Sequence, residues 1–198
     1  MNSDLTFRVA AAGLFLALAV SRRLTIRKFM DHRSAWAAMK NMPLDTSLLI
    51  AYVLIIEVSL VLYLFFPDTL AQATLPLAPA WRWSGAALSL AGMMFLVWAD
   101  HSLGKNFSVA LQIKEGHTLV THGPFRWVRH PIYSAFLLFS IGLTLLSASA
   151  AIGVTWVGGG IFVFAQRIAR EETMLIKQFG ESYRDYRRHT GAVFPKVR

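Results

Sequence analysis

The sequence contains no cysteine. Disulfide bonds, thiolate metal sites and thiol nucleophiles are therefore excluded. No Gly-rich turn of the dinucleotide-binding type follows a predicted strand, because Gly158-Gly159-Gly160 lies inside an apolar stretch, and no Gly-x-Ser-x-Gly elbow is present. These absences argue against disulfide scaffolds, thiol enzymes, soluble dinucleotide-binding enzymes and serine hydrolases.

Acidic residues are few, with 11 Asp and Glu against 20 Lys and Arg, so the net charge is +9. The basic residues flank apolar segments and are not interleaved with aromatics on a soluble domain. We therefore attribute the charge to membrane topology and predict no nucleic-acid partner. The histidines His101, His117, His122 and His130 match no zinc-binding spacing, so we predict no metal.

Apolar residues are abundant, at 55% of the chain with a mean hydropathy of +0.47, which predicts an integral membrane protein. We expect an all-α, polytopic membrane helical bundle with about five spans. Basic residues follow the first apolar run, so it is predicted to be a retained helix and not a signal peptide. The predicted spans are Leu5–Val20, Thr46–Phe66, Trp83–Ala99 and two helices within Ile132–Gln166 that turn near Ser147-Ala148-Ser149.

The predicted topology places the loop 21–45, the loop 100–131 and the C-terminus in the cytoplasm. All Lys and Arg except Arg8 and Arg82 then face the cytoplasm, in agreement with the positive-inside rule. We expect one domain over 1–198, with three spans in 1–100 and a cofactor loop, a helical hairpin and a C-terminal lid in 101–198. Gly180 is expected to bend or break the helical run in the lid.

A polar, basic and aromatic stretch from Gly116 to Tyr133 lies between two apolar runs. Glu171-Glu172 and the run from Phe179 to Tyr183 follow downstream. The order of these motif residues along the chain closely resembles that in the isoprenylcysteine carboxyl methyltransferases, which are integral membrane enzymes that use S-adenosylmethionine. The matching residues of the stretch are His117, Leu119-Val120, Gly123-Pro124, Arg129-His130-Pro131 and Tyr133. The resemblance covers Leu103 to Pro195. Phospholipid N-methyltransferases and sterol reductases carry similar patterns.

The resemblance implies that the cofactor is S-adenosylmethionine and that the methyl acceptor is an isoprenylated cysteine or a similar lipophilic substrate. With the predicted topology, the cofactor binds on the cytoplasmic side and the acceptor enters from the membrane. The resemblance also implies that Arg167 orients the acceptor carboxylate. The cofactor-binding residues that we predict are His117, Leu119, Val120, Gly123, Arg129, His130, Pro131, Tyr133, Glu171 and Glu172.

The residue types at these positions suit that chemistry. Methyl transfer to an ionised carboxylate needs no strong base, so orientation and preorganised charge matter most. The planar fork of Arg167 can hold a carboxylate, and Glu171 lies on the same helix face four residues later. Either Glu171 or Glu172 could accept hydrogen bonds from a ribose diol or an amino group, and Arg129 and His130 could bind a carboxylate.

Other interpretations remain open from the sequence. Arg167 could be a snorkelling interfacial arginine, and Glu57, an acid inside the second span, could be functional or could serve packing. The alternative functions are N-methylation of a phospholipid amine, a membrane reductase that uses a nicotinamide cofactor, and a non-catalytic lipid-binding protein. Binding of an adenosyl cofactor would separate the methyltransferases from the last two.

Overall fold

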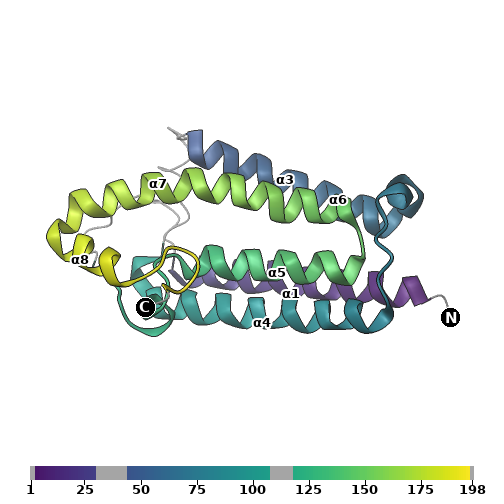
Figure 1. Ribbon diagram of the computed structural model, residues 1–198, viewed down its shortest axis with the longest axis horizontal. Coiled ribbons are helices and arrows are strands. Elements are labelled where there is room, and N and C mark those ends of the chain that lie inside the picture. Colours follow the sequence, from purple (N-terminus) through teal and green to yellow (C-terminus); the bar gives the residue numbers. More distant parts are fainter. Residues whose placement is uncertain (1–2, 30–43, 108–117, 197–198) are drawn as a thin grey trace.

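The protein is a helical bundle in the computed structural model, which describes residues 3–29, 44–107 and 118–196 (Figure 1). The long helices form two layers: α3 and α7 lie above, and α1, α4 and α5 lie below. Their bounds are α1 Ser3–Phe29, α3 Leu44–Phe65, α4 Pro79–Leu103, α5 Pro131–Ser147 and α7 Gly159–Phe179, and α8 Glu181–His189 follows α7. Shorter helical turns are η1 Pro67–Ala73, η2 Gly104–Asn106, η3 Gly123–Arg126, α6 Ala150–Ile152 and the π-helical η4 Gly153–Gly158.

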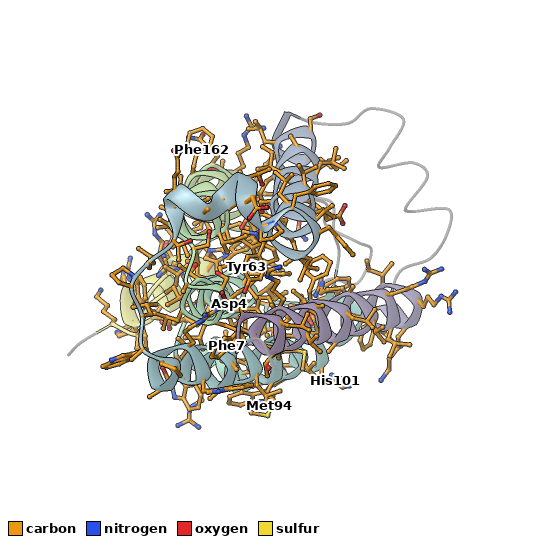
Figure 2. All side chains as sticks on the ribbon, turned by 90° about the vertical axis from the view of Figure 1, so that its right-hand side faces the viewer. Asp4, Phe7, Tyr63, Met94, His101 and Phe162 are labelled. Carbon is orange, nitrogen blue, oxygen red and sulfur yellow. The ribbon has the colours of Figure 1, made fainter. Side chains whose placement is uncertain are left out.

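Within the described residues, four helices are long and apolar enough to cross a membrane: Asp4–Phe29, Thr46–Phe65, Pro79–Asn106 and Ala150–Phe179. The helix α5 is apolar and shorter, so the predicted membrane bundle with about five spans is confirmed. Large apolar side chains face outward on both layers, among them Phe162 on α7 and Met94 on α4 (Figure 2). They form the surface that lipid tails would contact.

The first span is longer than predicted. We expected a loop from residue 21, but α1 continues through Arg22 and Arg27 to Phe29. Basic residues are good helix formers and lie favourably near a helix C-terminus, so they do not end this helix. The remainder of the predicted loop, up to residue 43, lies outside the described residues. Likewise, α4 is longer than predicted at both ends, and Pro79 occupies its first turn, where a missing N–H costs nothing.

The predicted turn within 132–166 is confirmed. The helix α5 ends at Ser147, and Ala148 adopts a left-handed conformation with φ of 50°. Ser149 then caps the next turn by accepting a hydrogen bond from the Ile152 backbone. The chain therefore reverses into α7, which lies in the upper layer (Figure 1).

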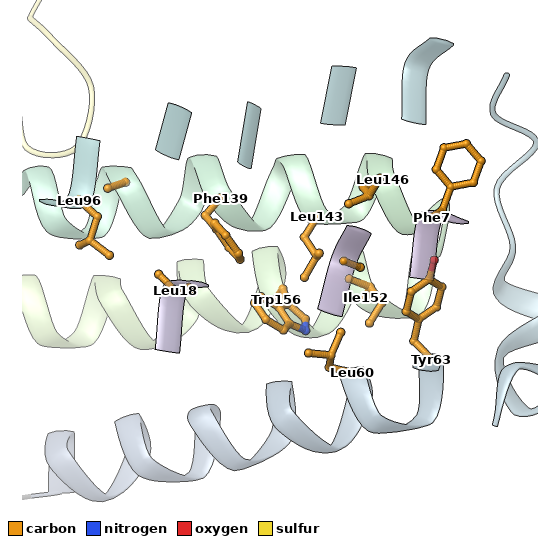
Figure 3. Close-up of a cluster of buried hydrophobic side chains, with 12 residues drawn as sticks. Phe7, Leu18, Leu60, Tyr63, Leu96, Phe139, Leu143, Leu146, Ile152 and Trp156 are labelled. Carbon is orange, nitrogen blue, oxygen red and sulfur yellow. The ribbon is translucent and has the colours of Figure 1, made fainter. Parts of the chain in front are cut away.

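The apolar core lies between the two layers (Figure 3). Its centre is Trp156, which packs against Phe139 and donates from its indole N–H to the Ser59 hydroxyl at 2.9 Å. The Tyr52 hydroxyl donates to the Trp156 carbonyl at 2.7 Å, and the same carbonyl accepts from the Gly159 N–H at the end of the π-helical turn. The bonds of Ser59 and Tyr52 attach α3 to the start of α7.

A different kind of packing joins α4 and α5. Gly142 lies so close to α4 that an added Cβ would be 2.5 Å from the Ser89 backbone nitrogen and 2.6 Å from the Gly85 carbonyl oxygen. The Ser89 hydroxyl donates across the same contact to the Phe139 carbonyl at 3.1 Å. Small residues thus allow the two backbones to touch, as is common between membrane helices.

Candidate active site in a cavity between the helices

A cavity of about 440 Å³ opens between α1, α3, α5 and α7. One part of its wall is apolar and is formed by residues such as Phe15, Leu49 and Phe164. The other part is polar. Its charged and polar lining residues are Arg22, Glu57, Asn106, Thr118, Arg129, His130, Tyr133, Arg167, Glu171, Tyr183 and Tyr186. Such a cavity suits one apolar and one polar ligand at the same time.

His130 stands at the start of α5, because Pro131 occupies the first turn and fixes the entry of the chain. Its side chain is buried between two acids, with Nδ1 3.4 Å from Glu171 Oε2 and Nε2 3.4 Å from Glu172 Oε1. Burial lowers the pKa of His130, but the hydrogen bonds and negative charges of the two glutamates outweigh it, so the pKa is raised above its usual value. The two glutamates therefore stabilise the protonated form of His130.

Glu172 forms a second part of the network. Its Oε1 accepts from Arg129 Nε at 2.9 Å and from Arg129 Nη2 at 2.6 Å, and its Oε2 lies 3.3 Å from Arg187 Nε. The Arg129 guanidinium also donates to the Thr190 carbonyl. Glu172 thus links the α5 entry, α7 and α8, and it does not line the cavity.

Glu171 and Arg167 meet at Tyr133. The Tyr133 hydroxyl donates to Glu171 Oε2 at 3.1 Å and accepts from Arg167 Nε at 2.9 Å. The Tyr133 ring stacks on Phe164, with 4.9 Å between centroids, and Arg167 is only 4% exposed. A buried arginine at a cavity wall, oriented through its Nε, can direct charge-assisted hydrogen bonds at an anion.

The C-terminal segment packs on the start of α5. The Arg129 N–H donates to the Gly191 carbonyl at 2.8 Å, and the His130 N–H donates to the Ala192 carbonyl at 2.9 Å. The Ser134 hydroxyl donates to the Val193 carbonyl at 2.6 Å. Gly180, with φ of 56°, ends α7 and lets α8 turn back, as the sequence predicted.

Two tyrosines of α8 reach the cavity. The Tyr186 hydroxyl donates to the Phe125 carbonyl, and Tyr183 is almost fully buried. Burial raises the pKa of both tyrosines, so each stays a neutral phenol at physiological pH. They give the polar end of the cavity two aromatic walls.

Most of the predicted site residues are brought together. Those that line the cavity are Leu119, Val120, Arg129, His130, Pro131, Tyr133, Arg167 and Glu171. Glu172 and Gly123 do not line it; Glu172 contacts Arg129 and His130, and Gly123 begins the turn η3. His117 lies outside the described residues. Among the described residues, no group of three or more His, Asp or Glu could hold a metal ion.

Sequence reasoning missed three contributors to the polar wall. Arg22 was assigned to a loop, whereas it lies on α1 and reaches the cavity. Asn106 and Thr118 bracket the undescribed segment 108–117, and the Thr118 N–H donates to Asn106 Oδ1 at 3.1 Å. Of the three, Thr118 had a local signal, because it lies between His117 and Leu119 in the polar stretch from Gly116 to Tyr133. Glu57, whose role was left open, also lines the cavity.

The fold and the cavity define an integral membrane protein with a polar site at one end of a helical bundle. Residues 85–177 match the family model of the isoprenylcysteine carboxyl methyltransferase (ICMT) family. The resemblance that we inferred from the sequence motifs is confirmed over this region, which contains Arg129, His130, Tyr133, Arg167 and both glutamates.

Curated proteins with similar sequences carry the same family name. A protein-S-isoprenylcysteine O-methyltransferase of Dictyostelium discoideum is 32% identical over 119 residues, covering 58% of this chain and 49% of that protein. The Homo sapiens protein of that name is 30% identical over 120 residues, covering 56% of this chain and 42% of the human protein. The chain thus spans about half the length of the curated relatives that it matches.

One solved structure has a similar fold. It is described as the eukaryotic intramembrane Ras methyltransferase ICMT, and it aligns with a TM-score of 0.57 at 24% identity. The alignment covers 96% of this chain and 63% of that one, so nearly the whole bundle described here has a counterpart in it.

Proposed function

We propose that the protein transfers a methyl group from S-adenosylmethionine to a lipophilic acceptor, and that the reaction is carboxyl O-methylation of an isoprenylated cysteine or a similar substrate. The observation that carries the proposal is the cavity in which Arg167 and Glu171 meet at Tyr133 beside an apolar wall. A cation binder, an anion binder and an apolar surface are what this pair of reactants requires. The family of residues 85–177 supports the same reaction.

The residues at the polar end fit S-adenosylmethionine. Glu171 provides a carboxylate for the amino group or the ribose diol, and Tyr183 and Tyr186 provide aromatic walls for the adenine. The backbone at Leu119 and Val120 offers further donors and acceptors. Glu172 would act indirectly, by fixing Arg129 and His130. When bound, the cofactor would supply an electrophilic methyl group.

The chain's own contribution is orientation. Arg167 would hold the acceptor carboxylate, and its Nε bond to the Tyr133 hydroxyl limits the directions in which its remaining donors can point. Exclusion of water by Phe164 and the apolar wall would strengthen each charge interaction. No proton has to move, because an acceptor carboxylate is already ionised at neutral pH.

We assign the polar end to the cytoplasmic side, because the basic residues of α1 and α8 gather there. The segment after Gly180 would serve as a lid, since its backbone packs on Arg129 and His130. Residues 1–198 would then act as one domain. The lipophilic acceptor would enter from the membrane and the cofactor from water.

The first test measures ligand binding and turnover of the detergent-purified protein. Calorimetric titration should show saturable binding of S-adenosylhomocysteine and none of a reduced nicotinamide dinucleotide. Transfer of labelled methyl to N-acetyl-S-farnesylcysteine should follow. Binding of the dinucleotide alone would favour the reductase, and binding of neither ligand would favour a non-catalytic role.

The role of Arg167 is tested by substitution. Arg167→Ala should lower the turnover number about 100-fold or more, because an oriented charge-assisted donor is lost, while S-adenosylhomocysteine affinity changes little. His130→Ala and Glu171→Ala should instead weaken S-adenosylhomocysteine binding. Arg170→Ala, on the exposed face of α7, is the matched control. Unchanged turnover in Arg167→Ala would show that its assigned role is wrong.

One observation favours a second candidate, N-methylation of a phospholipid amine. Glu57 lines the same cavity from within α3, and an acid near the acceptor suits an amine better than a carboxylate. Phosphatidylethanolamine offered in place of the prenylcysteine distinguishes the two. Methylation of the lipid that survives Arg167→Ala but not Glu57→Gln would establish this alternative.

A further inference from the structure

A buried ion pair lies beside the cavity, on helices that the predicted site did not include. Asp100 of α4 is 0% exposed, and its Oδ2 accepts from Arg22 Nη1 at 2.7 Å and from the Thr25 hydroxyl at 3.1 Å. A carboxylate buried in a membrane-spanning helix is costly unless it is paired. Asp100 therefore holds Arg22 in a fixed place and orientation.

The pair is aimed at the cavity. Arg22 lines the cavity, and Asp100 lies behind it and does not. Among the described residues, Nη1 is the Arg22 atom that makes a hydrogen bond, so Nε and Nη2 retain their donors. The guanidinium also lies over the Phe107 ring at 5.2 Å and the Phe136 ring at 5.6 Å, which confines it further.

A row of aromatic side chains connects Arg22 with Arg167. Arg22 lies over Phe136, Phe136 lies 6.3 Å from Phe164, and Phe164 stacks on Tyr133, whose hydroxyl accepts from Arg167. Both guanidinium groups thus border the same aromatic wall of the cavity. Each is anchored by a partner on a neighbouring helix, Asp100 for Arg22 and Tyr133 for Arg167.

We propose that Arg22 is a second anion-binding residue of this cavity, which holds the carboxylate of the lipophilic acceptor together with Arg167 and selects acids over their neutral analogues. The inference rests on the proposed function. It concerns α1, which lies outside the family-matched region 85–177. Asp100 and Thr25 act as positioning residues, because they touch Arg22 and not the acceptor.

The test compares an acid with its neutral analogue. The KM of N-acetyl-S-farnesylcysteine and the inhibition constant of its carboxamide are measured for wild type, Arg22→Met and the control Arg23→Met, which changes an exposed neighbour on α1. Arg22→Met should raise the KM of the acid about tenfold, since a hydrogen bond between charged groups is lost. The carboxamide constant and the affinity for S-adenosylhomocysteine should change less than about threefold.

A purely structural role for Arg22 predicts a different result. The KM of the acid and the inhibition constant of the carboxamide would then rise by the same factor, and that result would overturn the proposal. An unchanged preference for the acid would overturn it as well. Arg22→Met leaves Asp100 buried without its partner, so the double variant Arg22→Met/Asp100→Asn is prepared as well. It removes the unpaired charge and should show the same selective loss.

Failure of this inference is distinguishable from failure of the proposed function. Dissociation constants of the acid and the carboxamide, measured by calorimetric titration, do not depend on turnover. If wild type binds the acid in preference to the carboxamide, the Arg22 variants lose that preference and no methyl group is transferred, the proposed reaction is wrong and the anion site stands. If wild type methylates the acid and the Arg22 variants keep its preference, the reaction stands and the anion site is refuted.

Discussion

The α4–α5 contact and the cavity between α1, α3 and α7 are built from similar apolar residues, yet one is closed and the other is open. The difference lies in side-chain size at the facing positions. Gly142 and Gly85 allow backbone contact between α4 and α5, whereas Leu49, Phe15 and Phe164 keep the other helices apart. In a membrane, small residues decide where helices close, and large ones can leave room for a ligand.

The largest effect is expected from filling the closed contact. Gly142→Val would place side-chain atoms closer than van der Waals contact to the Ser89 and Gly85 backbones, which cannot move without separating the helices. We expect loss of the folded, monodisperse protein in size-exclusion chromatography. Gly13→Val, at an exposed helical glycine with nothing within 4 Å of an added Cβ, is the control. A normal elution profile for Gly142→Val would show that the α4–α5 contact does not depend on small residues.

A smaller effect is expected from truncating one side chain in each region. Leu143 is fully buried in the core, so Leu143→Ala should cost about 2–5 kcal/mol of unfolding free energy. Leu49→Ala enlarges a cavity that already exists and should cost less, since part of that side chain borders open space. Thermal unfolding in detergent measures both. Equal destabilisation would mean that the cavity wall is packed as tightly as the core.

The smallest effect concerns the charged end of the cavity. The pKa of His130 is raised in the folded protein, because the hydrogen bonds and charges of Glu171 and Glu172 outweigh burial. Its ion pairs therefore stabilise the fold fully below the unfolded pKa of about 6.5 and lose that contribution as the pH rises through the folded value. The melting temperature of wild type should exceed that of His130→Gln most at low pH. A constant difference in melting temperature between the two proteins across pH 6–9 would contradict this.

Much of the bundle was predictable from sequence because hydropathy marks spans and local signals mark turns. The turn near Ala148 and the break at Gly180 were both predicted and are present. The end of α1 was not, because Arg22 and Arg27 indicated a loop by composition while favouring a helix by propensity.

The gathering of Arg129, His130, Tyr133 and Arg167 at one cavity was predictable, because the family motif includes them. The pairing of Arg22 with Asp100 was not, since the two residues are 78 positions apart and neither belongs to a local pattern. The apolar lining could not be predicted either. A leucine that faces a cavity and one that faces lipid have the same sequence signature, and only the packing of the helices distinguishes them.

The backbone pairing of Arg129 and His130 with Gly191 and Ala192 also sets an order of assembly. Ser134 and its partner Val193 are 59 residues apart, and a ribosome that adds about 5–20 residues per second needs roughly 3–12 s to make that stretch. The helix α5 is complete at Ser147, so for most of this interval it has been synthesised while its entry lacks these partners. The start of α5, where Arg129 and His130 lie, can therefore reach its final backbone pairing only after the last residues of the described chain have been made.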